Sequence, residues 1–286
     1  MKNLTEYQKG IFFVFIAGLL WSTGGLLIKL ISLTAMQLAF FRCFIAAITF
    51  GLLFRKKILL VNKLTFINSV FYAAILITFV IATKKTTAAN AIFLQSTAPI
   101  YVLIFEPIFN KTKYERINVI TVAVCMVGML LFFVGKIEPG HLEGNIIALI
   151  SGLAFASFFL GMKKNDPKFQ NSSIFYGNVL VAIISIPFLF SLETLKTDDF
   201  LMVTFLGVFQ IAFAYAFFSA GLKRIFAVEA SIISMIEPVL NPVWVFIGYG
   251  EIPSVTGIIG GIIILTSITV RSLIAGKSKI RTKFNF

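Results

Sequence analysis

Apolar residues fall into ten stretches, each about 20 residues long and separated from the next by a short polar linker. A helix of about 20 apolar residues is long enough to cross the hydrocarbon core of a bilayer. The stretches lie at roughly 10–29, 35–54, 64–82, 88–108, 117–135, 144–162, 172–191, 200–220, 226–248 and 254–274. We therefore predict an all-α integral membrane protein with ten transmembrane helices and no room for an extramembrane domain.

Composition agrees with this interpretation. Hydrophobic residues make up 58% of the 286 residues and charged residues only 13%, where soluble domains carry about 25% charge. The first apolar run, 11–28, is long enough to span the bilayer and lacks a convincing cleavage site. We interpret it as a retained first span rather than a cleaved signal peptide.

The distribution of charge predicts the orientation of the chain. The net charge is +13, with 25 Lys and Arg against 12 Asp and Glu, and nineteen of the 25 lie in inner segments if the N-terminus is inside. This bias places both termini in the cytoplasm and the protein in a cell membrane, plasma or bacterial inner. It also removes the case for nucleic-acid binding. The basic tail, residues 277–283, fits this topology, and binding to lipid is the alternative.

Two sequence matches indicate an internal repeat. Residues 16–22 align with 150–156, so spans one and six correspond, and residues 88–99 align with 227–238, so spans four and nine correspond. Each repeat then holds five spans, and an odd number gives the second repeat the opposite orientation. We expect two domains, residues 1–142 with spans one to five and 143–286 with spans six to ten.

The chain resembles the EamA group of ten-span carriers in the drug/metabolite transporter superfamily. The resemblance covers nearly the whole chain and rests on these motifs: Gly-Leu-Leu-Trp-Ser at 18–22, the run from Thr87 to Pro99, Glu237-Pro238-Val239, Gly250-Glu251, and Gly260-Gly261. Thr112 stands where the second repeat has Glu251, which is one departure from symmetry. Inverted repeats give a physical route to alternating access, because two conformations can exchange the roles of the halves. Members of the group include exporters of amino acids and other metabolites as well as uptake systems.

Glu237 is the carboxylate nearest the middle of a predicted span. Ser231, Ser234 and Asn241 are spaced three or four residues apart around it, so all four share one helical face. Such a stripe lines a cavity, or else Glu237 caps backbone groups freed by Pro238. Removal from water favours the protonated form of a carboxyl, which makes Glu237 a candidate carrier of a coupled proton.

The matching segment in the first repeat has no carboxylate, because Ala98 occupies the position of Glu237. A proline lacks an amide hydrogen, so Pro99 and Pro238 each free a carbonyl group near the membrane centre. Trp21 and Ser22 lie at the middle of span one, in a cavity wall or in a packed helix contact. The candidate substrate-binding and pathway residues are Trp21, Ser22, Asn90, Gln95, Thr97, Pro99, Tyr101, Tyr215, Ser234, Glu237, Pro238 and Asn241.

Three further charged positions lie near span ends. Lys29 and Arg42 sit at the predicted outer ends of spans one and two. The favoured interpretation is that they reach the headgroups, and the alternative is that they form an outer gate or attract an anionic solute. Glu106, near the inner end of span four, is expected to pair with Lys111 or Arg116.

These observations favour a secondary active transporter that moves a small polar metabolite, an amino acid or a related compound, in the direction of export. Its partners are then the substrate, membrane lipids and a coupled proton, and one monomer is sufficient. A nucleotide-driven mechanism would require a GxxxxGK[ST] loop, which is absent. We expect no cofactor, metal or catalytic residue, because Cys43, Cys125 and His141 form no cluster. The alternatives are an enzyme acting on lipids, for which His141 between Glu138 and Glu143 is the closest constellation, or a passive channel.

Overall fold

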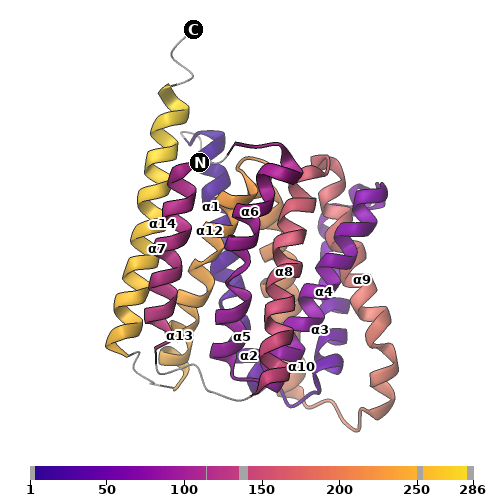
Figure 1. Ribbon diagram of the computed structural model, residues 1–286. Coiled ribbons are helices and arrows are strands. Elements are labelled where there is room, and N and C mark those ends of the chain that lie inside the picture. The colour runs from indigo at the N-terminus through magenta and orange to yellow at the C-terminus, as the bar shows by residue number, and fades with distance from the viewer. Residues whose placement is uncertain (1–3, 114, 135–140, 250–253, 282–286) are drawn as a thin grey trace.

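The computed structural model describes residues 4–113, 115–134, 141–249 and 254–281, and every regular element in these ranges is a helix (Figure 1). The α-helices are α1 Glu6–Trp21, α2 Gly24–Leu30, α3 Ala35–Phe54, α4 Lys63–Lys85, α5 Ala88–Gln95, α6 Ala98–Asn110, α7 Arg116–Phe132, α8 Leu142–Lys164, α9 Gln170–Ser185, α10 Thr197–Phe205, α11 Ala214–Leu222, α12 Ala227–Ser234, α13 Ile236–Tyr249 and α14 Val255–Arg281. The 3₁₀ helices are η1 Arg55–Leu59, η2 Pro167–Phe169 and η3 Ile186–Ser191, and η4 Leu206–Phe213 is a π-helix.

Long apolar helices are consistent with the predicted integral membrane protein. Within the described ranges, eight helical stretches are long and apolar enough to cross a bilayer, and Arg116–Leu131 is a shorter apolar helix. The eight are Glu6–Leu30, Ala35–Leu59, Lys63–Lys85, Asn90–Asn110, Leu142–Lys164, Pro167–Ser191, Thr197–Leu222 and Val255–Ile274. The predicted ninth span falls on α12 and α13, which are separated by Met235. Ten crossings and the inverted repeat stay predictions.

Helix starts follow local side-chain chemistry. Thr5, Thr34 and Asn62 each accept a hydrogen bond from the backbone amide three residues later, and the side chain of that later residue accepts one from the cap amide. This capping box satisfies backbone donors that would otherwise be free at the first turn. The polar linkers therefore fix where α1, α3 and α4 begin.

Helix α8 lies at the centre of the bundle and packs against α4, α5 and α6, while α3 and α4 pack against α9. Helices α7 and α14 form a separate antiparallel pair at one side (Figure 1). Gly128 of α7 lies so close to α14 that an added Cβ would be 3.0 Å from the Gly260 carbonyl oxygen. Helix α1 begins and α14 ends at the same end of the bundle (Figure 1).

Three of the membrane-embedded segments are interrupted near their middles. The breaks fall at Ser22 and Thr23 between α1 and α2, at Ser96 and Thr97 between α5 and α6, and at Met235 between α12 and α13. Two of these breaks precede Pro99 and Pro238, as expected for residues that cannot donate a backbone hydrogen bond. Helix α8, which corresponds to the first span in the predicted repeat, is continuous. The breaks leave irregular backbone at the level where a site is needed.

Candidate functional site

Two small adjoining cavities lie where the broken helices meet. The first, about 310 Å³, is lined by Gln95, Ser96, Ala98, Pro99, Phe155, Phe159, Ser231, Ser234, Met235 and Glu237. The second, about 340 Å³, is lined by Trp21, Arg42, Ile75, Leu76, Phe79, Gln95, Phe155, Gln210, Tyr215 and Glu237. Gln95, Phe155 and Glu237 belong to both, so the two cavities are parts of one central site. Much of this volume is narrow, and each part has free space for about one water molecule.

Glu237 reaches the site from the first turn of α13, directly after the break at Met235. A helix N-terminus carries a partial positive charge and free backbone amides, which favour a carboxylate there. Glu237 and the Tyr215 hydroxyl are close enough to interact electrostatically. No Lys, Arg or His of the described residues forms an ion pair with Glu237. The carboxyl group is therefore available to a ligand or a proton.

Gln95 lies across the site at the end of α5. Its side-chain Nε2 donates a hydrogen bond to Ser151 Oγ of α8 at 2.7 Å, which holds the amide at the junction of the two cavities. Ser234 lines the first cavity, and its hydroxyl donates to the Ala230 carbonyl within α12. Pro99 lines the same cavity from the start of α6.

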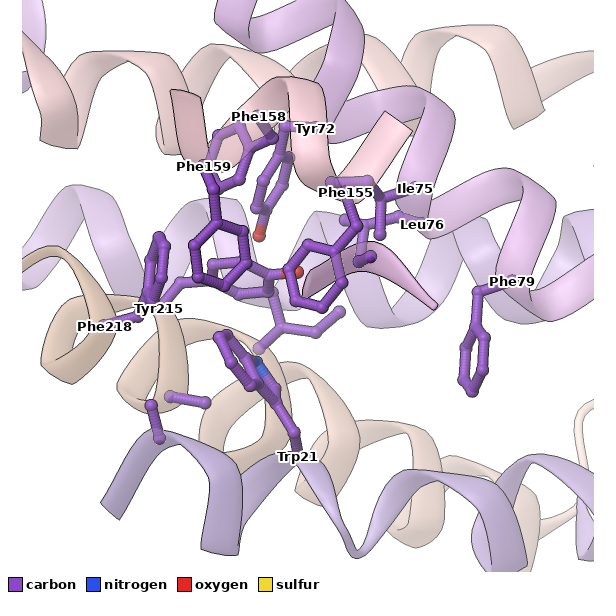
Figure 2. Close-up of a cluster of buried hydrophobic side chains, with 14 of the residues drawn as sticks. Trp21, Tyr72, Ile75, Leu76, Phe79, Phe155, Phe158, Phe159, Tyr215 and Phe218 are labelled. Carbon is purple, nitrogen blue, oxygen red and sulfur yellow. The ribbon is translucent and has the colours of Figure 1, made fainter. Parts of the chain in front are cut away.

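Aromatic rings form one wall of the site (Figure 2). The ring centroids of Trp21 and Tyr215 are 5.0 Å apart, and those of Trp21 and Phe155 are 5.7 Å apart. Phe155 contacts Phe159 at 4.8 Å along the same face of α8. These residues come from α1, α8 and α11, so the wall joins segments that are far apart in the sequence.

Arg42 is the site residue that the sequence placed wrongly. Its predicted position was the outer end of span two, in reach of headgroups. In the structure Arg42 is 1% exposed and lines the second cavity together with Glu237 and Tyr215. Helix α3 begins at Ala35, so Arg42 lies about 10 Å along the helix. Lys29 is exposed as expected, and its Nζ donates to the Thr86 carbonyl oxygen at 2.8 Å.

Several predicted pathway residues serve helix packing. Ser22 Oγ accepts a hydrogen bond from Trp244 Nε1 at 2.7 Å, and the Ser22 carbonyl accepts one from Asn241 Nδ2 at 3.1 Å. Asn90 donates to Asn145 Oδ1 of α8. Thr97 Oγ1 donates to the Leu94 carbonyl beside the helix break. Ser22 and Asn241 thus join α1 to α13 and do not line either cavity.

Tyr101 and Pro238 also lie outside the two cavity linings. Tyr101 belongs to α6 and is half-buried, whereas Pro238 is buried in the first turn of α13. Of the twelve candidate residues, the central site brings together Trp21, Gln95, Pro99, Tyr215, Ser234 and Glu237. A role in a transport pathway stays a prediction for all twelve.

Glu106 has partners that the sequence did not indicate. Its two carboxylate oxygens accept hydrogen bonds from the Ala227 and Val228 amides, at 2.8 and 2.7 Å. The predicted pairing with Lys111 or Arg116 is wrong, because Glu106 points toward the start of α12 and satisfies its first amides. The residue is a tertiary helix cap.

A second buried arginine joins α14 to three other helices. Arg271 donates to Glu229 Oε1 at 2.8 Å, to the Tyr7 hydroxyl at 2.9 Å and to Asn118 Oδ1 at 2.8 and 2.9 Å. Arg271 and Glu229 are each 1% exposed. This network lies at the end of the bundle where α1 begins, and the spacing of these residues in the sequence gave no signal for it.

Groups of metal-binding side chains do not occur among the described residues. The alternative of a lipid enzyme relied on His141 between Glu138 and Glu143, and Glu138 lies outside the described residues. Glu143 is exposed and pairs with Lys85 at 2.6 Å. No side chain of the central site is a histidine or a cysteine.

The helical fold, the three interrupted segments and the central cavity with its polar side chains are those of a multi-pass membrane protein. The sequence model of the EamA-like transporter family matches residues 8–134 and, a second time, residues 142–273. The chain belongs to this family.

Curated relatives carry transporter names. A protein of Archaeoglobus fulgidus named an uncharacterized transporter is 26% identical over 204 residues, which cover 71% of this chain and 73% of the relative. The pseudopaline exporter CntI of Pseudomonas aeruginosa is 21% identical over 91% of this chain and 94% of its own length. A solved crystal structure superposes with a TM-score of 0.79 at 17% identity, covering 94% of this chain and 99% of that one. The family and the names of these relatives indicate a membrane transporter of small molecules.

Proposed function

We propose that the protein is a secondary active transporter that exports a small polar metabolite by alternating access around the central site. The observation that carries the proposal is the meeting of two broken segments, α5–α6 and α12–α13, at a cavity that contains Glu237 and Arg42. Broken helices expose backbone groups to a substrate only where they line a cavity. Export is supported by a relative that is named an exporter and that aligns with 91% of this chain.

Alternating access needs contacts that close each end of the site in turn. At the end where α1 begins, the Arg271 network joins α1, α7, α12 and α14. At the opposite end, Ser32 hydrogen-bonds Asp199, and Lys84 Nζ donates to the Ile31 carbonyl at 2.7 Å. The proposed cycle releases one set of contacts while the other holds, so a continuous pore never forms. This arrangement is the reason to prefer a carrier over a channel.

The proposed moving units are the two predicted repeats, residues 1–142 and 143–286. Two separate matches to the same family model support a duplicated chain. Both termini then lie in the cytoplasm of a cell in whose membrane the protein is inserted, and one monomer encloses the whole site. The transmembrane orientation can be tested by labelling single cysteines introduced near either terminus in intact cells.

Glu237 is the proposed proton carrier. It faces the cavity without a counter-charge among the described residues, so a proton can neutralise it there. A carboxylate that binds a proton on one side and releases it on the other couples the proton gradient to movement of the substrate.

The test uses purified protein in liposomes loaded with a cell metabolite extract. Mass spectrometry identifies the solutes that leave, with and without an imposed proton gradient, and protein-free liposomes give the background. The wild type is expected to release a defined solute at a saturable rate that the gradient increases. Glu237→Gln is expected to lose the gradient dependence, whereas Glu193→Gln, at an exposed position, is expected to keep it.

Release of no solute above background would refute transport as the function. Equal dependence on the proton gradient in Glu237→Gln and the wild type would refute the proton-carrier role alone. A rate that rises linearly with solute concentration without saturating would favour a channel.

A further inference from the structure

Arg42 carries a buried charge that the protein leaves only partly satisfied. Its Nη2 donates to the Leu76 carbonyl at 3.0 Å. Its Nε and Nη1 have no oxygen or nitrogen acceptor among the described residues, although the guanidinium is 1% exposed. The neighbouring Cys43 thiol also interacts with the Arg42 side chain, as a weak acceptor without a full counter-charge. Buried donors are ordinarily paired, and a buried charge even more so.

The contrast with Arg271 shows what the protein does with an arginine that serves structure. Both side chains are 1% exposed. All three nitrogens of the Arg271 guanidinium group donate, and Glu229 supplies its counter-charge at 2.8 Å. In the described part of the chain, Arg42 has no carboxylate within ion-pair distance. Arg271 is satisfied by protein groups, whereas Arg42 is left open beside a cavity.

The second cavity is lined by further buried polar atoms that lack a hydrogen-bond partner among the described residues. These atoms are Trp21 Nε1 and Gln210 Oε1, and both side chains line the cavity with Arg42. The donors are two guanidinium N–H directions and the indole N–H. This set of donors is suited to an anion, and the planar guanidinium is suited to two parallel hydrogen bonds with a carboxylate.

Glu237 lines the same cavity but does not pair with Arg42. Tyr215 lies in electrostatic reach of both, so the two charged groups lie around one ring and are separated by more than an ion-pair distance. Arg42 and Glu237 therefore present two separate polar groups to the same cavity. The position of Arg42 is held by close packing of α3 on η4, because an added Cβ at Gly207 would be 2.7 Å from the Arg42 carbonyl oxygen.

We propose that Arg42 binds a carboxylate of the transported compound, which makes the substrate class small carboxylate-bearing metabolites. This inference rests on the proposed transport function and names the chemistry of its cargo. A phosphate group would bring more charge and more acceptors than one guanidinium and one indole can satisfy in a cavity walled by Ile75, Leu76 and Phe79. The carboxylate of the substrate supplies the counter-charge that Arg42 lacks. Binding of the substrate therefore neutralises the buried charge of Arg42.

The test uses liposomes loaded with the metabolite extract. It compares the solutes that four proteins release from them: the wild type, Arg42→Gln, Arg42→Lys and Arg55→Gln. Arg55 is exposed and provides the matched control. The wild type and Arg55→Gln are expected to release compounds that bear a carboxylate. Arg42→Gln is expected to release them at least about tenfold more slowly, the usual effect of losing charged hydrogen bonds. Arg42→Lys keeps the positive charge but loses the two parallel N–H donors of the guanidinium, so its release rate is expected to lie between those of the wild type and Arg42→Gln.

Thermal unfolding of the ligand-free variants separates binding from folding. A structural Arg42 would make Arg42→Gln less stable than the wild type, whereas an unsatisfied one leaves the melting temperature unchanged or raises it. A melting temperature lowered by more than that of Arg55→Gln overturns the proposal. So does wild-type release of only amines, sugars or phosphate esters, or an unchanged rate of carboxylate release in Arg42→Gln; these outcomes leave the transport function standing. If the wild type releases nothing, the transport function fails, and the substrate class with it.

Discussion

The buried pair of Arg271 and Glu229 gives the sharpest test of the structure. Replacing Glu229 with Gln keeps the size of the side chain but removes the negative charge. Arg271, which is 1% exposed, then retains the neutral partners Tyr7 and Asn118 and, at 3.9 Å, only the half-exposed carboxylate of Glu115 among the described residues. Removing one partner of a buried ion pair costs about 3–5 kcal/mol, because the other charge is left uncompensated.

The assay is thermal unfolding of the purified protein in detergent. At about 2 °C per kcal/mol for a chain of this size, Glu229→Gln is expected to lower the melting temperature by about 6 °C or more. Glu115→Gln is the control, since Glu115 is half-exposed and lies 3.9 Å from the same Arg271 nitrogen. An exposed pair contributes about 1 kcal/mol at most, so this variant should melt within about 2 °C of the wild type.

A double variant separates the pair from its surroundings. Glu229→Gln with Arg271→Gln removes both charges, so the loss of stability should be smaller than the sum of the two single losses. Additive losses, or a melting temperature for Glu229→Gln as high as that of Glu115→Gln, would refute the view that this ion pair holds α12 to α14.

Three other outcomes follow from local contacts. Glu106→Ala leaves the first two amides of α12 without acceptors and should cost about 1–3 kcal/mol for each amide in thermal unfolding, whereas Glu106→Gln should cost less. Gly207→Ala should lower both the melting temperature and the transport rate, because the added Cβ meets the Arg42 carbonyl oxygen at 2.7 Å. The Lys168 amide donates to Asp166 and holds the pKa of that carboxyl below its usual value. The stabilisation is therefore complete above about pH 5 and lost as the pH falls through the lowered pKa, so Asp166→Asn should melt below the wild type at pH 6, and the difference should shrink steadily as the pH is lowered.

Hydrophobic patterning was enough to predict the helical membrane fold, because a run of about 20 apolar residues has few other stable solutions. The breaks at Pro99 and Pro238 were also predictable, since the missing amide hydrogen is a local property. Glu237 directly precedes Pro238, and Gln95 lies four residues before Pro99, so each falls next to a helix break, and both line the central site.

The errors concern which face of a helix points inward. Arg42 is 7 residues into α3, where linear position alone allows either a headgroup or a buried environment, and tertiary packing decides between them. Ser22 and Asn241 are polar and central, but Asn241 Nδ2 donates to the Ser22 carbonyl and Trp244 Nε1 donates to Ser22 Oγ, so these groups join two helices. The role of Glu106 depends on the start of α12, 121 residues further along the chain. Such long-range contacts have no local sequence signal.

The interruption between α1 and α2 has no counterpart in the continuous helix α8. A carrier with two identical halves would have inward-open and outward-open states of equal energy, because exchanging the halves converts one state into the other. Unequal halves remove that degeneracy. Under the alternating-access mechanism proposed above, we therefore expect the empty protein to favour one of its two states before any substrate or gradient acts on it.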